Sequence, residues 1–196
     1  WLEGETYCDG YYTNKPKFLI SSLKEWFGDA ATVDNDYGYD WWPKVPSSPD
    51  FTIMSTFELM DQEVIKGYFN WGMNPCHSAP NASFVRQSMA KLDWLVVADQ
   101  VLTESATFWK APDMNPADIN TSVYFLPCAL IYEKPGTIAN SGRWLQWRYQ
   151  AVDPWEEAKP DYEMIDLLWQ EICRLYREEG GANPDPILNT KWDYYV

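Results

Sequence analysis

The sequence predicts an α/β fold with a parallel sheet, and one stretch near the middle of the chain carries most of this prediction. Residues 67–71 are rich in aromatic side chains, as strands often are, and Gly and Pro in residues 72–75 mark a turn after them. Asn81 can cap a helix, and residues 94–97 form an apolar run typical of a buried strand. Two strands joined by a helix lie parallel with a right-handed crossover, so these elements predict an α/β sheet.

Apolar periodicity and turn residues predict the other elements. The clearest helix is predicted at 161–177, where Met164, Leu168 and Ile172 share one face and two glycines lie just beyond the end. The further predictions, in chain order, are a helix at 18–27, a short helix within 51–62, a strand at 123–126 and a turn-rich pair of extended segments within 130–149.

The predicted elements divide the chain into three parts. Residues 51–178 form the predicted Rossmann-like half-domain, which would bind a dinucleotide cofactor. Residues 1–50 contain one predicted helix within otherwise aperiodic sequence, and residues 179–196 have no predicted secondary structure. Because both end segments are rich in aromatic residues without periodicity, we expect them to pack on neighbours outside this chain.

Composition excludes some classes of function. A formal net charge of −14 argues against nucleic-acid binding, because a phosphate backbone attracts Lys and Arg. It does not exclude a phosphorylated cofactor, since backbone amides can hold phosphate without a cation. The sequence contains no apolar run long enough to span a bilayer and no targeting signal, so direct membrane insertion is not expected.

The cysteines do not predict a metal site. Four cysteines are scattered without the spacing of metal ligands, and His77 is the single histidine. We therefore expect free, mostly packed thiols and neither zinc nor an iron–sulfur cluster in this chain. His77 has no assignable carboxylate or nucleophile as a partner, which argues against a catalytic role.

Candidate binding residues follow the two predicted strands, at the carboxyl edge where open α/β sheets bind ligands. Gly72 permits close approach of a phosphate, the loop supplies amide donors, and Ser78 offers a hydroxyl. An ordinary turn is the alternative interpretation of this loop. Asp99 can accept hydrogen bonds from a ribose or a guanine edge, or be a solvated strand end. Asp161 is equally suited to cap the last helix or to bind a ligand.

Several motifs, in order along the chain, give it a resemblance to a known family. The motifs are GMNP at 72–75, KLDWLVVAD at 91–99, TESATFW at 103–109, FLP at 125–127 and NSGRWLQ at 140–146. With these motifs, the chain resembles the catalytic α subunit of respiratory and periplasmic formate dehydrogenases, which are molybdopterin oxidoreductases. The resemblance covers nearly the whole chain, which corresponds to an internal slice of that subunit.

The resemblance implies a function and a set of cofactors. The parent enzyme would oxidise formate to carbon dioxide and pass two electrons to iron–sulfur centres, with molybdenum or tungsten held by two molybdopterin guanine dinucleotides. This slice would bind the guanosine end of one dinucleotide. The residues that correspond to family contacts are Gly72, Asn74, Ser78, Ala98, Asp99 and Asp161. Ser78 stands where relatives can have Thr, and Ala98 can contribute only its backbone.

The resemblance also implies what lies outside the slice. The iron–sulfur cluster and the catalytic Sec or Cys with its following His belong to other parts of the subunit, so this chain alone is predicted to be inactive, with no catalytic or metal residue of its own. Expected partners are the rest of the catalytic subunit, an iron–sulfur electron-transfer subunit and formate. The expected location is periplasmic.

Two other interpretations remain open from the sequence. The chain could be a non-catalytic, acidic and Trp-rich interaction module, or a slice of a related molybdopterin oxidoreductase with another substrate. Cysteine clusters and a Sec or Cys-His codon pair upstream in the reading frame would favour the enzyme.

Overall fold

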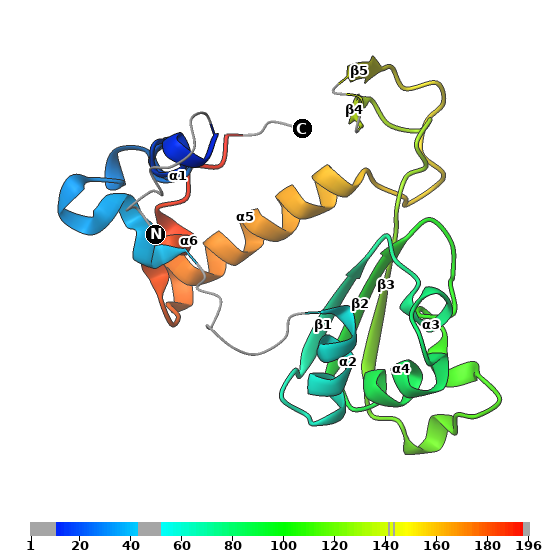
Figure 1. Cartoon of the computed structure of the whole chain (residues 1–196). Coiled ribbons are helices and arrows are strands. Elements are labelled where there is room, and N and C mark those ends of the chain that lie inside the picture. The colour runs from blue at the N-terminus through cyan, green and yellow to red at the C-terminus, as the bar shows by residue number, and fades with distance from the viewer. Residues whose placement is uncertain (1–10, 43–51, 141, 143, 194–196) are drawn as a thin grey trace. The chain divides into compact units, whose positions relative to one another are not determined.

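The computed structural model describes residues 11–42, 52–140, 142 and 144–193, and it has the predicted α/β architecture (Figure 1). Its centre is a parallel sheet of three strands in the order β1-β2-β3. The strands are β1 Gly67–Trp71, β2 Trp94–Asp99 and β3 Ser122–Pro127. The first two strands and the parallel pairing are confirmed, and β3 extends the predicted strand by one residue at each end.

The described residues form two compact units, and their boundaries differ from the predicted ones. Those within 1–47 and 165–196 form one unit, and those within 48–164 form the other. The last helix, α5 Asp161–Glu179, therefore begins in the second unit and continues in the first. Its apolar stripe predicts a helix but does not reveal which core the helix covers, so all but its last residue fell within the predicted central domain.

Helices cover one face of the parallel sheet and create its core (Figure 1). These are α2 Ile53–Asp61, the four-residue α3 Pro75–Ser78 and α4 Ala82–Met89. Asn81 caps α4 as predicted, because its side-chain oxygen accepts the Phe84 N–H at 3.3 Å. Side chains alternate between the faces of a strand, so one set from each strand meets these helices. The fully buried core side chains include Phe57, Met60, Val85, Met89, Leu95 and Val97.

The opposite face of the sheet is covered only near the carboxyl ends of its strands. There, Met164 from the start of α5 packs with Ala98 and Cys128. Farther along the same face, Phe69 is 46% exposed and Tyr124 is 58% exposed. Parallel sheets in complete α/β domains usually have both faces covered, so this face is incomplete in the described structure.

A separate hairpin follows the sheet and confirms the predicted pair of extended segments. Its strands, β4 Gly136–Ala139 and β5 Leu145–Arg148, pair antiparallel. Aromatic side chains on and after β5 are strongly exposed, among them Tyr149 at 84% and Trp155 at 75%. Exposed aromatic surface of this kind is typical of an interface.

The terminal unit contains more helix than the sequence predicted. Helix α1 Tyr11–Phe27 begins seven residues before the predicted 18–27, because the chain continues its helical path through Pro16. A proline inside a helix removes one backbone hydrogen bond, and the apolar stripe that predicted this helix begins only at Phe18. Leu23 and Phe27 of α1 are buried together with Ala31. Residues Val33–Trp41 form 3₁₀ turns in the stretch expected to be irregular.

A short helix, α6 Pro184–Leu188, lies in the tail for which no secondary structure was predicted. Pro184 occupies the first helical position, where no backbone donor is needed.

The cysteines that the structure describes are free thiols, as predicted. Cys76, Cys128 and Cys173 are free and buried, whereas Cys8 lies outside the described residues. Within the described part of the chain, no helix combines the length and apolarity that crossing a membrane requires.

Candidate functional site

The predicted site residues lie at the carboxyl edge of the parallel sheet. The Gly72 N–H donates to the Ala98 carbonyl at 2.8 Å, which joins the loop after β1 to the end of β2. Asp99 is the last residue of β2, and Asp161 starts α5 close to Cys128, which follows β3. The strand ends thus bring together residues that are distant in sequence.

The loop after β1 turns sharply and then forms a helical turn. Gly72 has φ of +61°, in the left-handed region that glycine adopts without strain. Its Cβ position is open space, with no atom within 4 Å. The following α3 was predicted as loop, and its Pro75 fits the first helical position. The Ser78 hydroxyl was predicted to be free for a ligand. In the structure it instead donates to the Asn74 carbonyl at 3.0 Å.

The Asn74 side chain ties this loop to the one after β2. Its Oδ1 accepts the Ser105 backbone N–H at 3.1 Å and the Ser105 hydroxyl at 2.9 Å. Its Nδ2 donates to the carboxylate of Glu104. The Ser105 hydroxyl also accepts the Cys76 N–H at 3.1 Å. Sequence reasoning missed Ser105, whose only signal was its place inside the motif at 103–109.

Two backbone donors of the loop remain available for a ligand. The N–H groups of Met73 and Asn74 have no hydrogen-bond partner among the described residues. The Asn70 side chain supports this turn, because its Nδ2 donates to the Met73 carbonyl at 2.8 Å. Asn70 is only 1% exposed, and its Oδ1 has no partner in the described structure. Amide donors in an open turn suit a phosphate.

Asp99 retains unused acceptor capacity. Its Oδ1 accepts the Gln100 N–H at 2.8 Å, and its other oxygen has no hydrogen bond among the described residues. The side chain of Ala98 is fully buried in the core, and its carbonyl already accepts the Gly72 N–H. A carboxylate at a strand end can accept the paired N–H groups of a guanine edge.

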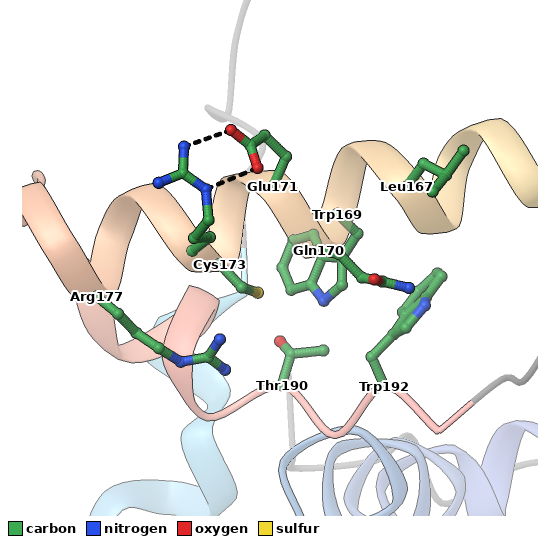
Figure 2. A pocket seen from close by; sticks show the side chains of 9 residues that line it. Leu167, Trp169, Gln170, Glu171, Cys173, Arg177, Thr190 and Trp192 are labelled. Atoms are coloured by element: carbon green, nitrogen blue, oxygen red, sulfur yellow. Dashed lines mark hydrogen bonds and ion pairs between the residues drawn. The ribbon is translucent and has the colours of Figure 1, made fainter.

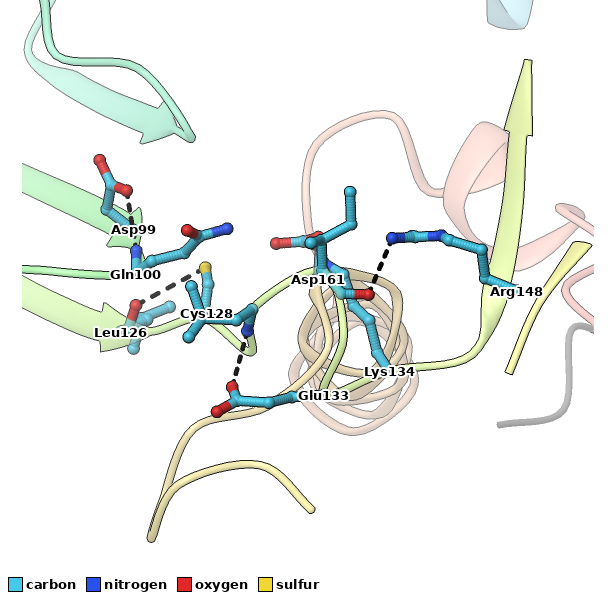
Figure 3. Close-up of polar contacts among 10 residues, drawn as sticks. Asp99, Gln100, Leu126, Cys128, Glu133, Lys134, Arg148 and Asp161 are labelled. Atoms are coloured by element: carbon cyan, nitrogen blue, oxygen red, sulfur yellow. Dashed lines mark hydrogen bonds and ion pairs between the residues drawn. The ribbon is translucent and has the colours of Figure 1, made fainter. Parts of the chain in front are cut away.

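Asp161 is the first residue of α5, and its carboxylate forms an ion pair with Lys134 (Figure 3). Burial alone raises the pKa of Asp161, but the Lys134 ammonium and smaller contributions from Cys128 and Trp71 lower it below its ordinary value. The indole N–H of Trp71 is buried and has no hydrogen-bond partner in the described structure. Burial, followed by the Asp161 carboxylate, raises the pKa of the Cys128 thiol to about 12. Cys128 is therefore a protonated packing residue at neutral pH.

A cavity of about 360 Å³ lies beside these groups, and Gln100, Cys128, Glu133 and Trp155 are among its lining residues. Gln100, which lines the cavity, directly follows Asp99 in the sequence. Trp155 offers an exposed indole for contact with a planar ligand. The surrounding carboxylates give this part of the edge an acidic character that suits the N–H groups of a base. Phosphates would instead require the amide donors of the loop after β1.

A second cavity, of about 520 Å³, lies in the terminal unit between α5 and the chain that follows α6 (Figure 2). Trp169 and Trp192 line it with their rings 5.8 Å apart, together with Arg177 and Thr190. None of the predicted binding residues belongs to this cavity. The positions of the predicted binding residues therefore favour the sheet edge as the candidate site, although the terminal cavity is larger.

Comparison with known proteins identifies the family. Residues 21–171 match the family model described as molybdopterin oxidoreductase. The chain is 39% identical to the nitrate-inducible formate dehydrogenase major subunit of Escherichia coli, over 94% of this chain and 18% of that protein. It is 42% identical to the alpha subunit of formate dehydrogenase 2 of Nitratidesulfovibrio vulgaris, over 93% of this chain and 18% of that protein.

A third relative, the formate dehydrogenase alpha subunit of Megalodesulfovibrio gigas, is 39% identical over 95% of this chain and 18% of its own length. The chain thus spans less than a fifth of these relatives, as expected for a slice of a larger subunit. The similarity bears out the resemblance noted from the sequence motifs. A family model that matches 21–171 of 196 residues covers most of the chain and implies a molybdopterin-type cofactor. The chain belongs to the molybdopterin oxidoreductase family.

Proposed function

We propose that this chain is part of the catalytic subunit of a formate dehydrogenase and binds the guanosine end of one molybdopterin guanine dinucleotide. One observation carries the proposal: the edge of the sheet joins free amide donors at residues 73–74 to a carboxylate with unused acceptor capacity at Asp99. A guanosine diphosphate moiety needs both kinds of group, since its phosphates accept hydrogen bonds and its guanine edge donates them.

The residues present fit such a ligand in distinct ways. The Met73 and Asn74 amides would bind the phosphates, and Gly72 leaves open space beside them. Asp99 would accept the guanine N–H groups, and Asp161 would reach a ribose hydroxyl while Lys134 balances its charge. The bound cofactor would supply the two-electron chemistry, whereas this chain contributes orientation and electrostatics.

The wider proposal follows the relatives' names and the family resemblance. The parent enzyme would convert formate to carbon dioxide with molybdenum or tungsten bound by two dinucleotides. Electrons would pass through an iron–sulfur cluster elsewhere in the subunit to an electron-transfer subunit, in the periplasm. The family match supports this interpretation over an unrelated interaction module.

Asp99→Ala tests the proposed site in the full-length subunit. We expect lower cofactor retention, because loss of a charge-assisted hydrogen bond costs on the order of 1.5–3 kcal/mol. Asp93→Ala is a matched control, since Asp93 is an exposed carboxylate that precedes the same strand at its opposite end. The measurement is the content of pterin and metal per purified polypeptide. Equal content in wild type and Asp99→Ala would count against the site.

A further inference from the structure

We propose that Ser105 is a positioning residue for the cofactor loop and acts through Asn74. The proposal rests on the function proposed above and adds a residue to which neither the sequence motifs nor the comparisons assign a role. Ser105 would hold the two amides at residues 73–74 in their ligand-ready arrangement without contacting the ligand.

Several hydrogen bonds converge on Ser105 and Asn74. Ser105 gives Asn74 Oδ1 two hydrogen bonds, from its backbone N–H at 3.1 Å and its hydroxyl at 2.9 Å. The same hydroxyl accepts the N–H of Cys76 at 3.1 Å. One serine therefore contacts the loop after β1 at two residues, although it lies 31 positions from Asn74 in the sequence.

The bonds from Ser105 to Asn74 Oδ1, called the clamp below, leave the backbone N–H of Asn74 free. The Asn74 carbonyl accepts the His77 N–H at 3.0 Å, the Ser78 N–H at 2.8 Å and the Ser78 hydroxyl at 3.0 Å. With the Asn74 side chain fixed by Ser105 and its carbonyl fixed by α3, both sides of this residue are constrained. The unpartnered N–H groups at 73 and 74 consequently have a defined orientation before a ligand arrives, which reduces the entropic cost of binding.

The Ser105 side chain is fully buried, with 0% of the residue exposed, so neither a ligand bound at the surface nor solvent contacts its hydroxyl. In Ser105→Ala, Cys76 N–H would lose its acceptor inside the protein, and a buried unsatisfied donor is costly. The Asn74 side chain also has both polar atoms engaged within the chain, with Nδ2 bonded to Glu104. The Asn74 side chain is thus held by residues of the loop after β2, while its backbone N–H faces no partner among the described residues.

Ser105→Ala in the full-length holoenzyme tests the proposal, with Ser88→Ala as the matched control. Ser88 is likewise 0% exposed, and its hydroxyl donates to the Phe84 carbonyl at 2.8 Å within α4, away from the loop. We expect Ser105→Ala to accelerate cofactor loss during dilution about tenfold, as follows from a lost buried hydrogen bond. Ser88→Ala should lower the unfolding temperature without accelerating that loss.

A double-mutant comparison separates positioning from a general loss of stability. Asn74→Ala and Ser105→Ala should each accelerate cofactor loss, and the double variant should be little worse than either one, because both remove the same clamp. Amide hydrogen exchange at Cys76 should become faster in Ser105→Ala and remain unchanged in Ser88→Ala. Fully additive effects, or cofactor loss at the wild-type rate in Ser105→Ala, would overturn the proposal.

The outcome for Asp99→Ala distinguishes failure of this inference from failure of the proposed function. Cofactor loss in Asp99→Ala combined with wild-type retention in Ser105→Ala would reject only the positioning role. Wild-type retention in both variants would reject the site itself, and with it the role of Ser105.

Discussion

The isolated chain, supplied with pterin cofactor and molybdate or tungstate, should not oxidise formate. The described residues contain no group of three or more His, Cys, Asp or Glu side chains that could hold a metal ion. His77 is the single imidazole of the chain. With only one guanosine end bound, neither the positioning of the substrate nor the preorganised electrostatics of an active site would be complete.

Reduction of a dye acceptor by formate measures this activity, and the full-length holoenzyme in the same assay is the positive control. We expect turnover only from the holoenzyme and, at most, weak nucleotide binding by the isolated chain. Formate-dependent turnover by the isolated chain that Asn74→Ala abolishes would place a complete active site within these residues.

Phe57→Ala should cause a large loss of stability in the sheet unit. Phe57 is 0% exposed and belongs to the core that α2 and α4 form over the sheet. Truncating a buried phenylalanine removes apolar contacts and leaves a cavity, which costs about 3–5 kcal/mol. Equilibrium unfolding in urea, followed by far-UV circular dichroism, measures the change.

Phe69→Ala is the control for this prediction, because Phe69 lies in the same sheet but is 46% exposed on its incompletely covered face. Its ring contacts Trp94 at a centroid distance of 5.1 Å, so a small loss is expected. Similar losses of unfolding free energy for the two variants would show that the helix-covered face is not the main core of this unit.

Local patterns predicted the parallel sheet because its elements have strong local signals. The apolar strand β2, the Asn81 cap and the turn at Gly72 are each encoded within a few residues. The beginning of α1 was missed because the apolar stripe that predicts this helix starts only at Phe18, after Pro16. Helix α6 is too short for its periodicity to be recognised.

The site was only partly predictable for a different reason. Asp99 could be placed at the edge from the parallel topology alone, since strand ends are defined by local sequence. The pairs Asn74 with Ser105 and Lys134 with Asp161 join residues 31 and 27 positions apart, and no local pattern encodes such contacts. The motifs of the family indicated which segments matter, but not that the first pair links two of them.

Amide hydrogen exchange of the full-length subunit, with and without its pterin cofactor, is the most direct test of the binding site. We expect the cofactor to slow exchange at residues 72–78 and 99–107, because its phosphates and guanine would contact one edge of the sheet. Exchange at the opposite edge, around Asp93, should not change. Cofactor-dependent protection elsewhere in the subunit, with none at 72–78 or 99–107, would contradict the assignment of the guanosine end to this chain.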